Sequence, residues 1–188
     1  MSEQSGEDKQ PSPPSIADRL SDMIADARGN SLFAPAMLGA LVVALADQAS
    51  KVWIVKVLRL PELRHIELSP FVDFTYVRNY GASFGMGAEG GVISRIVLSI
   101  FAILIVGFLI SWLTKVRRVL PAVGIAFIIG GAAGNLIDRL LLGYVIDFID
   151  VAISFFPWVF NVADSAINVG VACLLIDTFR NGGADEPG

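Results

Sequence analysis

Four long apolar stretches dominate the pattern of hydrophobic and polar positions along this chain. They cover residues 32–46, 96–113, 119–137 and 155–176. Together with its flanking residues, each stretch can cross a hydrocarbon core of about 30 Å, which takes about 20 helical residues. Backbone polar groups within lipid must be satisfied inside their own segment, so helices are the expected state. The pattern therefore predicts four transmembrane helices.

The chain before the first apolar stretch changes character near Ser15. Residues 1–15 are polar and rich in Pro, Ser, Glu and Gln, which predicts a tail without a packed core. Apolar residues then recur at helical spacing between charged ones, at Ile16, Leu20, Met23, Ile24 and Ala27. This spacing predicts a short amphipathic helix on the membrane surface rather than a cleavable signal peptide. We expect residues 1–30 to form this tail and helix, 31–178 the membrane domain and 179–188 a second tail.

The segment between the first two spans, about residues 52–95, is too long for a bare loop. Its residues 71–77 alternate aromatic or β-branched side chains with others, which predicts a strand. The expected fold class is an all-α membrane protein with four transmembrane helices and a small extracytoplasmic β-sheet on the membrane surface. Small residues at 130–134 allow close helix contact, so the third span should lie inside the bundle.

Composition agrees with a membrane protein, because only 17% of the residues are charged and 54% are hydrophobic. Lys115, Arg117 and Arg118 crowd the short turn between the second and third spans, which predicts that this turn and both termini are cytoplasmic. Four arginines in the segment 52–95 weaken that bias. The single cysteine, Cys173, excludes a disulfide within the chain. No basic nucleic-acid surface and no phosphate-binding loop are present.

Ionisable residues within or beside the spans are the candidates for chemistry, because charge at membrane depth is costly. They are Asp47, Lys51, Asp138, Arg139, Asp147, Asp150 and Asp164. Counting helical rise brings Asp138, Asp147 and Asp164 to one outer surface. Two carboxylates that share a site divide acid and base roles, as in an aspartic protease. The residues alone do not choose between Asp138 and Asp147. The alternative is that Asp138 pairs with Arg139 or another cation and that Asp147 or Asp164 caps a helix.

Other chemistries have weaker support. Ser83 lies in a Gly-x-Ser-x-Gly pattern, but that motif needs a strand-turn-helix setting and a histidine partner. The only histidine, His65, lies in a polar stretch before the predicted strand. One histidine and one distant cysteine do not make a usual zinc site, so we expect no metal and no cofactor. Intramembrane carboxylates with a lysine would also suit a proton-coupled transporter. A non-catalytic membrane scaffold is the third alternative.

Five short motifs carry a specific resemblance. They are Asp47-Gln48-Ala49-Ser50-Lys51, Asn79-Tyr80-Gly81-Ala82-Ser83-Phe84, Gly130-Gly131-Ala132-Ala133-Gly134-Asn135-Leu136-Ile137-Asp138-Arg139, Val145-Ile146-Asp147-Phe148 and Phe160-Asn161-Val162-Ala163-Asp164. In this order and spacing, over residues 38–170, the chain resembles lipoprotein signal peptidase, also called signal peptidase II. In that family Ser83 belongs to an Asn-x-Gly-Ala-x-Phe signature rather than to a nucleophile elbow.

The resemblance implies a multi-pass aspartic endopeptidase of the bacterial inner membrane, with its active site at the outer face. Such an enzyme removes the signal peptide from diacylglyceryl-modified prolipoproteins, immediately before the modified cysteine. Membrane lipids are its surroundings, and the cyclic peptide globomycin is its expected inhibitor. The catalytic residues implied are Asp147 and Asp164. The substrate-binding or site-ordering positions implied are Asn79, Asn135, Asn161, Asp47, Lys51, Asp138 and Arg139.

Overall fold

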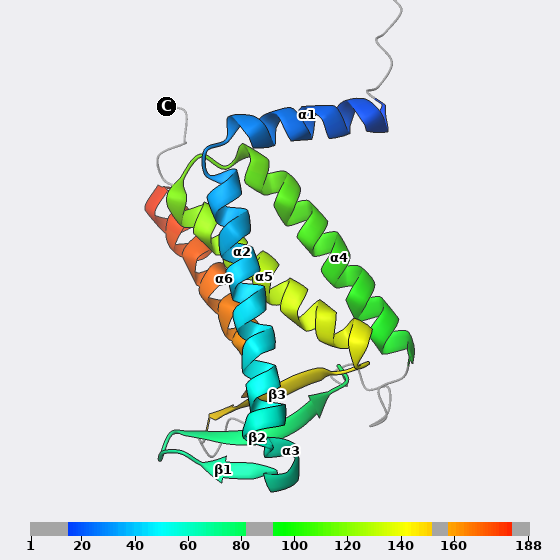
Figure 1. Cartoon of the computed structure of the whole chain (residues 1–188). Coiled ribbons are helices and arrows are strands. Elements are labelled where there is room, and N and C mark those ends of the chain that lie inside the picture. Colours follow the sequence, from blue (N-terminus) through cyan, green and yellow to red (C-terminus); the bar gives the residue numbers. More distant parts are fainter. Residues whose placement is uncertain (1–14, 82–91, 152–157, 182–188) are drawn as a thin grey trace, which may run out of the picture.

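The computed structural model describes residues 15–81, 92–151 and 158–181. Four helical segments in these ranges are long and apolar enough to cross a membrane, which confirms the predicted spans. The first joins α2 (Phe33–Val52) to a π-helical segment, η1 (Trp53–Val57); the others are α4 (Val92–Lys115), α5 (Val119–Leu141) and α6 (Val162–Asn181). The protein is therefore a multi-pass membrane protein. Figure 1 shows a small sheet at one end of these helices, called the sheet end below.

Helix α1 (Ile16–Gly29) lies across the opposite end of the spans (Figure 1). It begins with a capping box, in which the Asp18 amide donates to Ser15 Oγ at 3.1 Å and the Ser15 amide donates to Asp18 Oδ2 at 2.9 Å. Directly after α1, the buried side-chain amide of Asn30 donates to three carbonyl oxygens, those of Leu113 and Thr114 in the last turn of α4 and that of Val116 just after it. Asn30 therefore ties the amphipathic helix to the span beside it.

Helix α5 forms the interior of the bundle, as its small residues predicted. Of its most apolar window, 56% is buried, against 17% to 28% for the other three spans. A Cβ at Gly130 would lie 2.6 Å from the Cβ of Val43 in α2, and a Cβ at Gly131 would strike the Ala163 carbonyl oxygen in α6. Glycine at these positions lets both neighbouring helices pack directly on the α5 backbone.

The sheet has four antiparallel strands in the order β1-β2-β3-β4. Strands β1 (His65–Glu67) and β2 (Val72–Asn79) follow the short helix α3 (Leu60–Leu63), and β2 confirms the predicted strand. Strands β3 (Val145–Val151) and β4 (Val159–Phe160) come from the connection between α5 and α6, where the sequence pattern predicted none. The fourth apolar stretch, which begins at residue 155, therefore passes through β4 before α6 begins, and residues 155–157 lie outside the described ranges.

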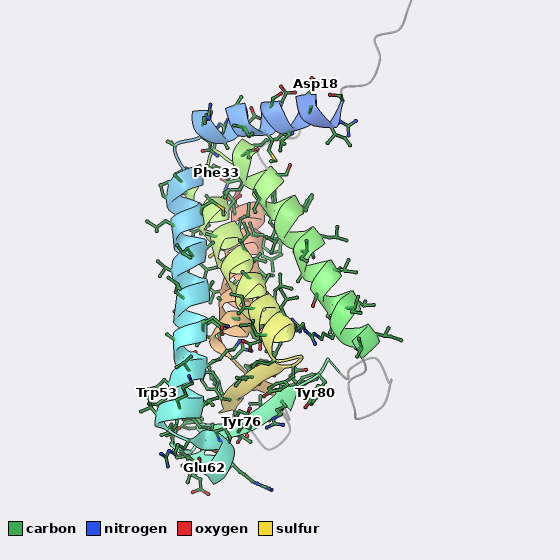
Figure 2. All side chains as sticks on the ribbon, turned by 45° about the vertical axis from the view of Figure 1, so that its right-hand side comes forward. Asp18, Phe33, Trp53, Glu62, Tyr76 and Tyr80 are labelled. Carbon is green, nitrogen blue, oxygen red and sulfur yellow. The ribbon has the colours of Figure 1, made fainter. Side chains whose placement is uncertain are left out.

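A small apolar core fixes the sheet to the end of the first span. Four apolar side chains are buried there, those of Ile54, Leu60, Ile146 and Phe148. Burying each of them stabilises the folded protein by about 1.5–3 kcal/mol. Phe74 packs its ring edge-on against Trp53 and Phe148, with centroids 6.2 and 5.9 Å away. Figure 2 shows Trp53, Tyr76 and Tyr80 gathered at this end of the molecule. The core holds β3 across the ends of α5 and α6.

Candidate active site

Strand β3 positions Asp147 by alternation. Its neighbours Ile146 and Phe148 point into the apolar core, so the Asp147 side chain projects from the other side of the strand. There it is 2% exposed. Strand β2 lies alongside, with Val77 opposite Asp147, and the Asn79 amide donates to Asp147 Oδ2 at 2.9 Å. The pairing of two distant segments thus brings Asn79 to this carboxylate.

Asp164 is placed by the first turn of α6. Its backbone N–H donates to Asn161 Oδ1 at 2.9 Å, while the backbone N–H of Asn161 donates to Asp164 Oδ2 at 3.3 Å. This reciprocal pair is a capping box, so Asp164 does cap a helix. Its other carboxylate oxygen remains available to a neighbour, and Asn135 of α5 donates to Oδ1 at 2.8 Å. The side chain is only half-buried, unlike that of Asp147.

Asn161 connects the two carboxylates. Besides capping α6 with Asp164, it donates from Nδ2 to Asp147 Oδ1 at 2.6 Å and to Asn135 Oδ1 at 3.1 Å, and it is fully buried. Within residues 15–81, 92–151 and 158–181, no lysine or arginine nitrogen lies within 4.0 Å of either carboxylate. Asp147 and Asp164 are therefore held by neutral amides.

The surroundings of Asp147 favour its protonated form. Burial and, to a smaller extent, the negative charge of Asp164 raise its pKa from 3.8 to about 6, against the hydrogen bonds from Asn79 and Asn161. A buried carboxyl beside a second carboxylate is the arrangement that lets one member hold a proton near neutral pH. Such a pair can donate a proton and accept one in the same reaction.

A second pair of carboxylates lies next to the first and has a different environment. Lys51 Nζ lies 2.8 Å from Asp47 Oδ2 and 2.9 Å from Asp138 Oδ2, and all three residues are at most 3% exposed. The cation that pairs with Asp138 is thus Lys51 of α2, and not the adjacent Arg139. Gly134 is required beside this cluster, because a Cβ there would lie 2.6 Å from Asp47 Oδ2.

This cluster of Lys51, Asp47 and Asp138 also holds the backbone that carries the first pair. The Ala163 amide, next to Asp164, donates to Asp47 Oδ1 at 2.9 Å. The Ile146 amide, next to Asp147, donates to Asp138 Oδ2 at 3.0 Å. Lys51 in turn donates to Asn135 Oδ1 at 3.3 Å. Asp47 therefore holds the start of α6, Asp138 holds β3, and Lys51 holds the side chain of Asn135.

Gln48 also contacts this cluster, although the sequence pattern did not identify it as a site residue. Its Nε2 donates to Asp138 Oδ1 at 2.9 Å, to the Gly134 carbonyl oxygen at 3.1 Å and to Asp47 Oδ2 at 3.2 Å. It thereby joins α2 to α5. Its place between Asp47 and Lys51 in one motif was the available signal, but helical spacing alone does not show that its amide turns toward Asp138.

Arg139 lines a hollow between α4 and the pair α5–α6. The guanidinium is partly buried and donates to the Asn135 carbonyl oxygen at 3.3 Å. Arg139, Asn135 and Asp164 form the polar part of the hollow, which has a volume of about 340 Å³. The remaining walls are apolar and consist of Leu98, Phe101, Ala102, Ile105, Ile128, Ala132 and Ile167.

The other sequence candidates lie elsewhere. Asp150, farther along β3, accepts a hydrogen bond from Thr75 Oγ1 at 2.7 Å. The ring of His65 on β1 contacts Thr75 at 2.9 Å and lies 3.9 Å from Asp73. Ser83, the nucleophile of the serine-triad alternative, lies outside the described residues. The structure thus brings together every residue that the family resemblance assigned to the site.

The sequence model of a known family, signal peptidase (SPase) II, matches residues 39–180. The chain belongs to the signal peptidase II family. Signal peptidase II is an aspartic peptidase, so this chain is one too. The lipoprotein signal peptidase of Caulobacter vibrioides is 50% identical over 141 residues, covering 74% of this chain and 83% of that protein. The lipoprotein signal peptidase of Alteromonas mediterranea is 42% identical over 142 residues, covering 73% and 76%.

Two solved structures also resemble this chain. Both are described as bacterial membrane enzymes studied by the in meso method. One has a TM-score of 0.70 and 30% sequence identity, and the match covers 82% of this chain and 93% of that chain. The other has a TM-score of 0.67 and 32% identity, covering 77% and 92%. The membrane fold described above is therefore shared with experimentally determined structures.

Proposed function

We propose that this chain removes signal peptides from diacylglyceryl-modified prolipoproteins and cuts immediately before the lipid-modified cysteine. Membership of the signal peptidase II family supports processing of lipoprotein signal peptides. The single observation that carries the proposal further is the pair Asp147 and Asp164, bridged by buried Asn161, whose side-chain amide donates to Asp147 and whose backbone N–H donates to Asp164.

Asp147 and Asp164 act as one catalytic unit in this proposal. The ionised member deprotonates a water molecule, whose oxygen attacks the scissile carbonyl carbon. The protonated member polarises the carbonyl oxygen. When the C–N bond breaks, the departing nitrogen takes a proton from the pair and leaves as an amine. The raised pKa of Asp147 supports this division, because it moves proton uptake by the pair toward neutral pH.

The asparagines act as positioning residues. Asn79 and Asn161 donate to Asp147, and Asn135 donates to Asp164. An amide orients a carboxylate without adding charge, so the pair is held in place and can still share a proton. Lys51, with Asp47 and Asp138, holds the segments around them. Arg139 is placed to contact substrate at the edge of the hollow.

The hollow beside Asp164 fits a substrate that arrives from the lipid. Its walls on α4, α5 and α6 are apolar, and its polar end is formed by Asn135, Arg139 and Asp164. A diacylglyceryl group strongly favours the membrane, since each CH₂ buried in lipid adds about 0.8 kcal/mol to the free energy of membrane binding. We infer that the modified precursor enters sideways between α4 and α5–α6. Globomycin would inhibit by occupying the same carboxylates.

The proposed location is the bacterial inner membrane, with the sheet end outside the cytoplasm. Lys115, Arg117 and Arg118 lie at the other end of the bundle, and such a cluster favours the cytoplasmic side. Both termini are then cytoplasmic. Residues 1–30 and 179–188 flank a membrane peptidase domain of residues 31–178.

A cleavage assay tests the proposed function. The purified protein is incubated with a prolipoprotein before and after diacylglyceryl modification, with and without globomycin, and the products are weighed by mass spectrometry. We expect one new product that begins at the modified cysteine, formed only from the modified precursor and suppressed by globomycin. Equal cleavage of the unmodified precursor, or a cut at another bond, would contradict the proposal.

A further inference from the structure

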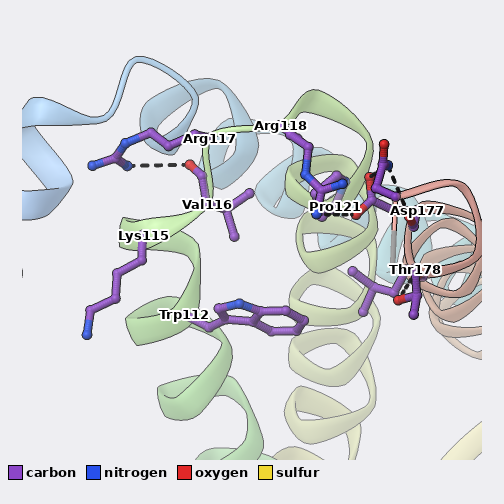
Figure 3. A pocket seen from close by; sticks show the side chains of 10 residues that line it. Trp112, Lys115, Val116, Arg117, Arg118, Pro121, Asp177 and Thr178 are labelled. Carbon is purple, nitrogen blue, oxygen red and sulfur yellow. Dashed lines mark hydrogen bonds and ion pairs between the residues drawn. The ribbon is translucent and has the colours of Figure 1, made fainter. Parts of the chain in front are cut away.

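A second hollow lies at the end of the bundle opposite the carboxylates. It has a volume of about 390 Å³ and is enclosed by the ends of α4, α5 and α6 and by the turn between α4 and α5. Figure 3 shows Trp112 projecting between the helices, with Arg118 and Asp177 on the far side. The proposed peptidase chemistry at the sheet end uses none of these residues.

The polar lining of this hollow carries an excess of positive charge. Lys115, Arg117 and Arg118 contribute three positive charges and Asp177 one negative charge, which leaves a net charge of +2. Arg118 is held 2.9 Å from Asp177, and Arg117 donates to the Thr114 carbonyl oxygen at 2.7 Å. Lys115 is exposed and has no hydrogen bond or ion pair to any described residue. Two of the cations are thus held in place and the third is free to contact a ligand.

An apolar groove continues from this hollow along α4. Phe108, Ser111, Trp112 and Lys115 line a space of about 290 Å³, which shares Trp112 and Lys115 with the basic hollow. The Phe108 and Trp112 rings lie 6.2 Å apart, and their side chains are 66% and 41% exposed. Lys115 is the last residue of α4, so the basic end lies at the depth of lipid head groups, where tryptophan is favoured.

We propose that this hollow binds an anionic phospholipid. The phosphate diester contacts Lys115, Arg117 and Arg118, and one acyl chain lies along Phe108 and Trp112. Charge favours an anionic head group, since basic pockets between the ends of transmembrane helices bind such lipids. The groove that runs from the cations toward the middle of α4 favours a lipid over a soluble anion.

Binding of added lipid to the full-length protein in detergent tests the proposal, with native mass spectrometry as the readout. Phosphatidylglycerol is compared with phosphatidylcholine at equal concentration, and inorganic phosphate is a third arm. We expect phosphatidylglycerol to be retained more strongly than either. The variant Lys115→Gln should weaken its retention about fivefold, the contribution of one cation at a membrane surface. Lys56→Gln is the matched control, because Lys56 is exposed near the end of the first span at the sheet end.

Trp112→Ala separates the two parts of the site. It should weaken retention of phosphatidylglycerol and leave any binding of inorganic phosphate unchanged, because it removes the wall of the acyl groove and no charge. Equal retention of the two phospholipids by the wild type would overturn the proposal. So would an equal loss in Lys115→Gln and Lys56→Gln, or full retention by Lys115→Gln.

Discussion

Two neighbouring pairs of carboxylates at the sheet end have opposite electrostatic environments. Asp47 and Asp138 flank the ammonium of Lys51, at 2.8 and 2.9 Å. Asp147 and Asp164 are joined instead by two neutral groups of Asn161, because its side-chain Nδ2 donates to Asp147 and its backbone N–H donates to Asp164. Removing one member of a buried ion pair leaves the charge of its partner uncompensated, which is costly. A pair held by amides alone can gain or lose a proton at much lower cost.

We infer from this difference that one buried cation divides the four acids between two tasks. Asp47 and Asp138 accept hydrogen bonds from the backbone beside Asp164 and Asp147, so the charged pair holds the polypeptide in place. In the proposed mechanism the other pair, which has only an uncharged bridge, transfers protons. If this division is correct, substitutions in the first pair should mainly affect stability and those in the second mainly affect turnover.

The largest expected effect is on catalysis by Asp147→Asn and Asp164→Asn. Each variant should lose at least about a thousandfold in the rate of precursor cleavage while remaining folded, because it removes one member of a proton-sharing unit. Asp150→Asn is the matched control on the same strand, where Asp150 bonds to Thr75, and it should cleave at nearly the wild-type rate. Turnover within tenfold of the wild-type rate by either Asp147→Asn or Asp164→Asn would contradict a catalytic role for that residue.

The next largest effect is on stability in Lys51→Met. Removing the cation leaves Asp47 and Asp138 buried without a partner, which should lower the free energy of unfolding by about 3–5 kcal/mol. Thermal unfolding in detergent measures the change against Lys56→Met, whose exposed lysine should matter by less than about 0.5 kcal/mol. A Lys51→Met protein as stable as this control would show that the cation does not hold the cluster together.

A smaller effect should appear in the pH dependence of stability. The folded pKa of Asp147, about 6, exceeds its unfolded value of 3.8, so the folded state binds the proton more tightly. The stability that this proton contributes is complete below about pH 4 and is lost as the pH rises through 6, by at most about 2–3 kcal/mol. Thermal unfolding at pH 4 to 7 should therefore show a steeper decline for the wild type than for Asp147→Asn. Parallel curves would be inconsistent with a raised pKa.

The smallest effect is expected in Asp138→Asn. The asparagine can still accept the hydrogen bond from the Ile146 amide, but it no longer neutralises Lys51. We expect a loss of about 1–2 kcal/mol in stability and about a tenfold loss of activity, through misplacement of β3. Thermal unfolding and the cleavage rate at two substrate concentrations measure both. A fully stable Asp138→Asn protein without any activity would reassign Asp138 to the catalytic unit.

The sequence pattern within each segment was sufficient to predict the features that depend on that segment alone. Hydropathy predicted four spans, the small residues at 130–134 predicted a buried third span, and alternation predicted β2. Rise along the helices correctly suggested that the acids meet at one end. These features depend on the solvent that each segment faces, and neighbouring residues are enough to indicate that.

The division of the acids was not predictable from pattern, because it depends on contacts between distant segments. Lys51 meets Asp138 only when α2 packs on α5, and Asn79 meets Asp147 only when β2 pairs with β3. Strand β3 is a short run in a connection, and its register with β2 leaves no local signal. Only the resemblance to a known family distinguishes Asp147 from Asp138 at the level of the sequence.

The most direct measurement of the central claim is the residual cleavage rate of the double variant Asp147→Asn/Asp164→Asn. If the two carboxylates work as one unit, removing the second should cost almost nothing once the first is gone, so the double variant should match the single variants within a few fold. If the fold-losses in cleavage rate of the two single variants multiply in the double variant, the two aspartates act independently. The proposal that they share a proton as one unit would then be wrong.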